Sequence, residues 1–509
     1  MTALARAAAL ATALATALSL ATLPAGCGPG HGRAASALDP RLGPASDCAA
    51  FADPRLQANL DLRTGSRVRE GNSAELLVNG RSSFARRIAN ATGADLILVK
   101  TFVFADDEVG RRLAALLAER ARAGALVIVQ YDVKGSAGGA PLRELAANGD
   151  LERPLGEHDI MRGLRDAGVI VVPTNPPTRA LQLQEWRDNL VRLFRDPHAA
   201  LERAAGSLAI LNHSDHEKYW LTGRVGPDGQ VSLRAIVGGM NVASEYAYGG
   251  TRLIDKLSRR RGWRDTDVEL VGPVLPELVT RFFDVMAHHT GHPVDPAWRA
   301  RWTVAQPVAG SARVRFVWNQ PSLSLRRAIE KLYATLIDAT PRGAVVRLES
   351  AYFAPSRLVR RALYRAMHRG TRLAVLTNSP ETSDIGVLVD ASRFAFYAML
   401  REDAVVALFE RRPRPDLGET TLHSKVASFG TCGPVIIGSA NLDAQSAEHN
   451  SEDVVVIDDP ALRQAFDAMY DTDIAPDRAQ RITLARFRAL SVLDWIKATW
   501  AFVLGDYWL

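Results

Sequence analysis

The sequence predicts an α/β protein made of two similar lobes, each a β-sheet flanked by helices. Two observations predict this. Each half of the 509-residue chain alternates apolar, β-branched segments with amphipathic segments in the same order. Each half also carries one short motif, His-x-Lys followed by a Gly-Gly/Ser-x-Asn turn, at His216 and at His423. We expect the two lobes to face each other, with both motifs at their interface.

The elements follow the same order in both halves. In the first half the expected strands and helices are Asp95–Phe104 (strand), Asp107–Ala123 (helix), Ala125–Tyr131 (strand), Asp159–Ala167 (helix) and Val169–Val172 (strand). In the second half they are Ala344–Phe353 (strand), Ser356–His368 (helix), Thr371–Thr377 (strand), Ser392–Arg401 (helix) and Ala404–Phe409 (strand). A strand with the His-x-Lys motif follows each series, over residues 211–219 and 421–429.

The N-terminal segment, residues 1–26, predicts an export signal. Arg6 is its only charge, an Ala/Leu-rich stretch follows, and small residues precede Cys27. The sequence LPAGC at 23–27 is compatible with bacterial lipoprotein cleavage; ordinary signal cleavage and an uncleaved anchor are the alternatives. We therefore expect an exported or membrane-associated bacterial protein, at the periplasmic face or as a lipoprotein.

Composition divides the rest of the chain. We expect an irregular arm over 27–75, a first lobe over 76–305 with an insertion at 173–214, a second lobe over 306–480, and an aromatic C-terminal segment over 481–509. Besides Cys27, the chain has only Cys48 and Cys432. These two could form a disulfide in an oxidising compartment or stay as thiols, and the sequence leaves both options open.

The His-x-Lys motifs carry the chemistry. Residues two apart on a strand face the same side, so His216 and Lys218 should point into one site, as should His423 and Lys425. Such pairs suit a phosphodiester, because an imidazole can attack phosphorus or move a proton while an ammonium holds a non-bridging oxygen.

Two further residue types recur at matched positions. Asn241 and Asn441 stand in the Gly-Gly/Ser-x-Asn turns, and we expect them to bind phosphoryl oxygens. Glu245 and Glu452 each lie 29 positions after the histidine of their own half. We expect these carboxylates to fix the imidazole tautomers and stabilise the cationic form.

This arrangement resembles the phospholipase D superfamily, which has two H-x-K-x4-D motifs in one chain. The resemblance covers most of residues 75–475. It departs where the motif aspartate is expected, since Gly223 and Gly430 stand there. The resemblance implies two phospholipase D-like lobes with the site between them, His216 as the nucleophile that forms a phosphohistidine, and His423 as the acid and base. No cofactor or metal is expected, because lysines and histidines supply the positive charge.

Three stretches look most like bacterial cardiolipin synthases of the phospholipase D type: YFAP at 352–355, RDTDVELVGP at 264–273 and GSANLDAQS at 438–446. The resemblance implies a phosphatidyltransferase that acts on membrane phospholipids such as phosphatidylglycerol and phosphatidylethanolamine. The alternatives are a hydrolytic phospholipase D, an exported nuclease or phosphodiesterase, and an inactive lipid-binding relic. The formal charge of +6 argues against a nucleic-acid partner. We expect a monomer, because both motifs lie in one chain.

Three segments outside the motifs could contact lipid or simply pack on the lobes. The insertion contains an amphipathic stretch, Leu181–Arg195, and Arg252–Arg264 forms a basic loop. The C-terminal stretch Leu490–Leu509 holds three of the nine tryptophans, and its charged residues argue against a membrane span. For this stretch we expect either docking at a membrane surface or contact with the second lobe.

Overall fold

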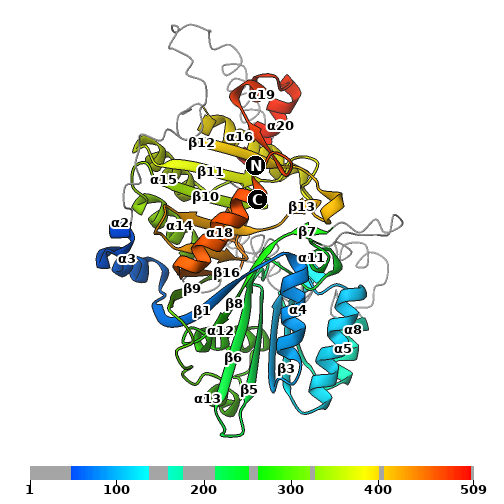
Figure 1. Ribbon diagram of the computed structural model, residues 1–509. Helices are drawn as coiled ribbons and strands as arrows, with labels where there is room; N and C mark the ends of the chain where they lie inside the picture. Colours follow the sequence, from blue (N-terminus) through cyan, green and yellow to red (C-terminus); the bar gives the residue numbers. More distant parts are fainter. Residues whose placement is uncertain are drawn as a thin grey trace, which may run out of the picture.

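The computed structural model describes residues 48–136, 159–175, 213–250, 262–320, 327–400 and 406–505. Two lobes share one 15-stranded sheet, with strand order β17-β12-β11-β10-β14-β15-β16-β9-β1-β8-β6-β5-β2-β3-β4 (Figure 1). A separate two-stranded sheet, β13-β7, lies where the lobes meet (Figure 1). This is the two-lobed α/β fold that the sequence predicts.

The first lobe follows two short helices, α2 (Cys48–Ala52) and α3 (Pro54–Thr64). Its elements, in chain order, are β1 (Val68–Val78), α4 (Asn79–Ala91), β2 (Leu96–Thr101), α5 (Glu108–Arg122), β3 (Leu126–Asp132), α6 (Val133–Ser136), α8 (Asp159–Asp166), β4 (Ile170–Thr174), β5 (Tyr219–Val225), β6 (Val231–Gly238), α11 (Ser244–Ala247), β7 (Trp263–Arg264), β8 (Thr266–Val271), α12 (Leu275–Thr290) and α13 (Pro296–Trp302).

The second lobe repeats this order and then ends in a small helical region. Its elements are β9 (Ala312–Asn319), α14 (Ala328–Ala339), β10 (Val345–Ser350), α15 (Arg357–His368), β11 (Arg372–Thr377), α16 (Gly386–Leu400), β12 (Val406–Arg411), β13 (Thr421–Leu422), β14 (Lys425–Phe429), β15 (Val435–Gly438), α17 (Ala444–Glu448), β16 (Glu452–Asp458), α18 (Pro460–Asp473), β17 (Ala479–Ile482), α19 (Leu484–Arg488) and α20 (Val492–Gly505).

The sheet is pseudo-symmetric about the β1–β9 pair, which is antiparallel. On one side β2, β3 and β4 are parallel and β5 runs antiparallel to β2; on the other, β10, β11 and β12 are parallel and β14 runs antiparallel to β10. Parallel neighbours need crossover helices, and α5, α8, α15 and α16 fill that role. The strands that follow the two motifs, β5 and β14, therefore occupy equivalent places.

Local sequence explains the main elements. The side chain of Asp107 caps α5 by accepting from Gly110 N–H, and Leu113 and Leu117 of α5 are buried. Strand β2 is buried at every residue, which explains the apolar run Leu96–Val99 at its start. One apolar core includes residues from both lobes, among them Phe282 of α12 and Phe466 of α18. This shared core holds the two lobes together beneath the site.

The structure differs from the sequence prediction in the arm. Residues 27–75 were expected to be irregular, but within the described part helices α2 and α3 form and strand β1 begins at Val68. Asp53 caps α3, whose Leu60 packs into the core of the second lobe. The prediction was wrong here because short, polar helices have weak periodicity, and tertiary contacts form them. The export signal, the helix expected at 181–195 and most of the basic loop lie outside the described residues.

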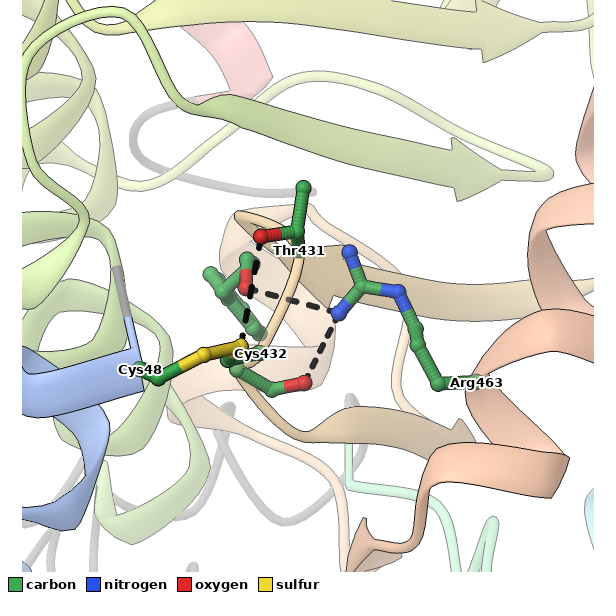
Figure 2. Close-up of a disulfide and its surroundings, with 6 residues drawn as sticks. Cys48, Thr431, Cys432 and Arg463 are labelled. Atoms are coloured by element: carbon green, nitrogen blue, oxygen red, sulfur yellow. Dashed lines mark hydrogen bonds between the residues drawn. A yellow bond between two sulfur atoms is a disulfide. The ribbon is translucent and has the colours of Figure 1, made fainter. Parts of the chain in front are cut away.

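The two cysteines that the sequence left open are joined. Cys48 at the start of α2 forms a disulfide with Cys432 in the turn after β14, at a sequence separation of 384 (Figure 2). Beside it, Arg463 of α18 donates to the carbonyls of Phe429 and Gly433 and fixes the same turn (Figure 2). The disulfide therefore ties the N-terminal helices to the second lobe.

The C-terminal helix packs on the second lobe. Its Trp495 ring lies 4.6 Å from the Tyr397 ring of α16, in an edge-to-face arrangement. Val492 and Leu493, at the start of α20, are 71% and 69% exposed. None of the helices within the described residues is both long and apolar enough to cross a membrane.

We predict that reduction of this disulfide destabilises the protein. Cross-linking two distant residues restricts the unfolded chain, so its loss should lower the free energy of unfolding by about 2–4 kcal/mol. Urea unfolding with and without reductant measures the effect, and the double variant Cys48→Ser/Cys432→Ser is the control that should not respond to reductant. An identical midpoint for the oxidised and reduced wild-type protein would refute the prediction.

Candidate active site between the lobes

The two motif histidines lie at the junction of the lobes, just outside the long strands. His216 precedes β5, and His423 lies between β13 and β14. The backbone N–H of His216 donates to Ser451 O of the second lobe at 2.8 Å, and that of His423 donates to Arg264 O of the first lobe at 2.7 Å. Each histidine is thus fixed by the opposite lobe.

The carboxylate partners are crossed in the same way. Nδ1 of His216 lies 2.9 Å from both carboxylate oxygens of Glu452, and Nδ1 of His423 lies 2.7 Å from Oδ2 of Asp265. A carboxylate accepts, so each Nδ1 donates and each Nε2 is left without a proton in the neutral ring. This is the tautomer that a nucleophile or general base needs.

The prediction for the carboxylates was therefore half wrong. Glu452 does hold an imidazole, and it is that of His216 in the other lobe. Glu245 lies on α11, and among the described residues no hydrogen bond or ion pair joins it to either imidazole. The matched spacing of 29 residues was a coincidence.

Asp265 is the residue that the sequence interpretation missed. Gly238 pairs with Asp267 in the first lobe as Gly438 pairs with Val454 in the second, so Asp265 and Glu452 occupy equivalent positions. Asp265 directly precedes β8, and Glu452 is the first residue of β16. The basic loop before Asp265 makes the distance in sequence from His216 to Asp265 longer than that from His423 to Glu452, so equal spacing could not identify Asp265. An alignment of the two strands would have identified it.

The two lysines lie beside their histidines. Nζ of Lys218 donates to His216 O at 2.7 Å and lies 5.5 Å from the centre of the Phe102 ring. Nζ of Lys425 donates to His423 O and lies 2.9 Å from His423 Nδ1. Both lysines are almost fully buried.

The charges of the two motifs act on one another. Burial lowers the pKa of His216 well below its usual value, and the charges of Lys218 and Lys425 lower it further. Burial and the charge of Lys425 lower the pKa of His423 to about 4. Burial also lowers the pKa of Lys218 to about 7 and that of Lys425 to about 8. The two histidines and two lysines therefore act on one another within one site.

The pKa values of the two carboxylates, Glu452 and Asp265, are shifted in opposite directions. Burial raises the pKa of Glu452 to about 7, although the charge of Lys218 and a hydrogen bond from Ser439 oppose the change. Burial also acts to raise the pKa of Asp265, but the charge and hydrogen bond of His423 outweigh it, so the pKa is lowered. Asp265 can thus stabilise an imidazolium at His423.

Asn241 has a structural task in addition to any contact with substrate. Its Oδ1 accepts from the backbone N–H groups of Phe102 and Val103 at 3.1 and 3.0 Å, and its Nδ2 donates to the Tyr246 hydroxyl at 2.8 Å. The Phe102 ring lies 4.9 Å from His216 and the Tyr246 ring 5.1 Å from His423. Asn241 therefore positions the aromatic neighbours of both imidazoles.

Asn441 is buried, and its Oδ1 has no hydrogen-bond partner within the described residues. Its backbone N–H donates to Ser446 Oγ at 3.2 Å. The predicted contact of Asn241 and Asn441 with phosphoryl oxygens stays a prediction.

The glycines at the motif aspartate positions lie far from the imidazoles. Gly223 is five residues beyond Lys218 along β5, about 16 Å of extended chain, and a side chain there would meet the Trp302 ring at 2.7 Å. Gly430 directly follows β14 and has a φ of 60°, a conformation that favours glycine. Local structure therefore explains why a glycine fits at each of these two positions.

Arg264 links the lobes behind His423. Its guanidinium donates to Asp473 of α18, with Nη2 2.6 Å from Oδ2, and its Nη1 lies 3.2 Å from Ser424 Oγ. Arg411 donates to the same carboxylate at 2.8 Å. All four side chains are buried, so this ion-pair cluster fixes the backbone that carries His423.

Comparison with known proteins agrees with this geometry. The family model described as "Cardiolipin synthase, PLD-like domain" matches residues 344–474. A probable cardiolipin synthase of Bacillus subtilis is 23% identical over 446 residues, which cover 87% of this chain and 73% of that protein. Cardiolipin synthase A of Pseudomonas aeruginosa is 28% identical over 409 residues, which cover 79% of this chain and 67% of that protein.

A solved structure shares the fold. The phosphatidylserine synthase of Haemophilus influenzae aligns with a TM-score of 0.58 and 12% identity, over 89% of this chain and 99% of that one. The fold and the paired motifs are those of a phospholipase D-like protein. Within that class the chain is similar to bacterial cardiolipin synthases, which confirms the resemblance inferred from the sequence.

We predict that the crossed carboxylates matter for turnover and that Glu245 does not. Loss of the Nδ1 partner allows the wrong tautomer, so Asp265→Asn and Glu452→Gln should each lower kcat by about 10²–10⁴-fold on a chromogenic phosphodiester. Glu245→Gln is the matched control and should stay within about threefold of wild type. A large loss in Glu245→Gln with wild-type rates in Asp265→Asn would show that Glu245 supports an imidazole and would exclude the crossed pairing.

Proposed function

We propose that this protein is a phosphatidyltransferase of the cardiolipin synthase type, acting through a phosphohistidine. The observation that carries this proposal is the pair of buried imidazoles, each with Nδ1 directed at a carboxylate of the opposite lobe, beside two buried lysines. This arrangement provides a nucleophile, an acid and base, and two cations for phosphoryl oxygens without further groups.

In the first step, Nε2 of His216 attacks phosphorus of the donor phospholipid and the bond to the head-group oxygen breaks. The departing oxygen takes a proton from His423, and Lys218 and Lys425 offset the charge on the phosphoryl oxygens. The anionic substrate also counters the lysine charges that lower the pKa of His423, which favours protonation of that ring. The choice of His216 as nucleophile follows the family resemblance.

In the second step, a hydroxyl of the acceptor gives its proton to His423 while its oxygen attacks phosphorus. The phosphorus–nitrogen bond breaks and His216 is restored. Asp265, with its lowered pKa, stabilises the His423 imidazolium that forms. A lipid hydroxyl as acceptor yields a new phospholipid, and water as acceptor yields phosphatidic acid.

Other observations support the proposed substrate class and the proposed location of the protein. The relatives named as cardiolipin synthases support phospholipids as substrates. We further propose that the protein is exported and acts at a membrane surface. The Cys48–Cys432 disulfide supports this, because such bonds persist in oxidising compartments. The exposed Val492 and Leu493 give α20 an apolar surface that suits contact with lipid.

A hydrolytic phospholipase D is the second candidate, because the same two steps with water need the same residues.

We predict that purified protein in mixed vesicles of phosphatidylglycerol and phosphatidylethanolamine makes cardiolipin in excess of phosphatidic acid. The variant His423→Ala should keep less than about a tenth of the wild-type rate, a loss of at least about 1.4 kcal/mol. Phosphatidic acid as the only product would replace the synthase with the hydrolase, and an active His423→Ala would refute the two-histidine mechanism.

A further inference from the structure

Asp384 is an exposed carboxylate on the loop between β11 and α16 of the second lobe. The Tyr352 hydroxyl donates to both of its oxygens, at 2.7 and 2.8 Å. Tyr352 itself is 7% exposed and packs with Ala351 and Leu388. The buried Tyr352 therefore holds the carboxylate of the exposed Asp384 in one orientation, whereas the side chain of an ordinary surface aspartate is free to rotate.

This carboxylate lies on the His423 side of the site. Ala351, next to Tyr352, donates its backbone N–H to the carbonyl of Ser424, the residue between His423 and Lys425. The negative charge of Asp384 also acts to raise the pKa of both His423 and Lys425. Asp384 is thus close enough to act on the charges of the site, and the residue as a whole is exposed.

In the part of the chain that the structure describes, no arginine or lysine forms an ion pair with Asp384; its hydrogen bonds come from Tyr352. Lys218 and Lys425 lie beside the histidines, and the nearby carboxylates Glu452 and Asp265 are already engaged by the imidazole Nδ1 atoms. A positively charged group on the substrate would be repelled by those lysines unless a carboxylate stood near it. Asp384 provides that carboxylate.

The position indicates which part of the substrate it meets. His423 exchanges protons with the alcohol oxygen that leaves or attacks phosphorus, so the alcohol must lie on this side of the site. Tyr246 and Trp263 place their rings 5.1 and 5.0 Å from the His423 ring and line the same side. Aromatic faces and a carboxylate together form a recognised environment for an ammonium group.

We propose that Asp384 binds the ammonium group of an aminoalcohol head group and thereby selects ethanolamine-type phospholipids as phosphatidyl donors. This specificity role rests on the proposed function, because the side of His423 defines where the alcohol lies. The donor loses ethanolamine, which carries away the proton from His423, and the phosphatidyl group remains on His216 until the acceptor hydroxyl attacks.

Binding tests the proposal without turnover. In a His216→Ala background, calorimetry should show that short-chain phosphatidylethanolamine binds more tightly than phosphatidylglycerol of the same chain length. Adding Asp384→Asn keeps a hydrogen-bond acceptor but removes the charge, and should weaken binding of the ethanolamine lipid about fivefold and that of the glycerol lipid less than about twofold. Asp384→Glu should restore the preference. Tyr352→Phe should reduce the preference in part, because it removes the hydroxyl that orients the carboxylate.

Glu381→Gln is the matched control, since Glu381 is an exposed carboxylate of the same loop. It should leave both affinities unchanged. Equal losses for both lipids in Asp384→Asn, or no loss for either, would overturn the proposal. The wild-type protein is assayed with the same lipids as donors: if it cleaves neither, the proposed function fails while the binding result still decides the role of Asp384.

Discussion

The structure depends on two hydrogen bonds that cross between the lobes, from His216 to Glu452 and from His423 to Asp265. Buried imidazoles and carboxylates are costly when they are alone, so each needs its partner. Because each pair takes one member from each lobe, neither lobe can form a complete site. The relative position of the lobes is therefore a condition for chemistry, and the rest of the fold maintains it.

The sheet and its core supply that position. The antiparallel pair β1–β9 joins two equivalent half-sheets, and the apolar core beneath them includes helices α12 and α18 of both lobes. The buried ion pair of Arg264 with Asp473 fixes the chain beside His423 from across the junction. The disulfide adds the N-terminal helices to the second lobe. Hydrophobic contacts hold the lobes together, while polar contacts fix the relative positions of the site residues.

The sequence predicted the repeated α/β order and both His-x-Lys pairs, because strong periodicity and duplicated motifs are local signals. It failed where the answer depended on contacts between lobes. Glu245 was chosen by spacing, although Asp265 occupies the equivalent place once the strands are aligned by register. Helices α2 and α3 were missed because their stability comes from packing and the Cys48–Cys432 bond. The role of Asp384 could not be seen either, since Tyr352 meets it only in the folded chain.

The crossed pairing can be measured without any substrate. Nitrogen-15 NMR of labelled histidine reports the tautomer and protonation of each ring, and each signal can be assigned from the corresponding His→Ala variant. We predict that Glu452→Gln changes the signals of His216 and leaves those of His423 in place, whereas Asp265→Asn does the opposite. If each substitution instead changed only the histidine of its own lobe, the crossed site would be contradicted.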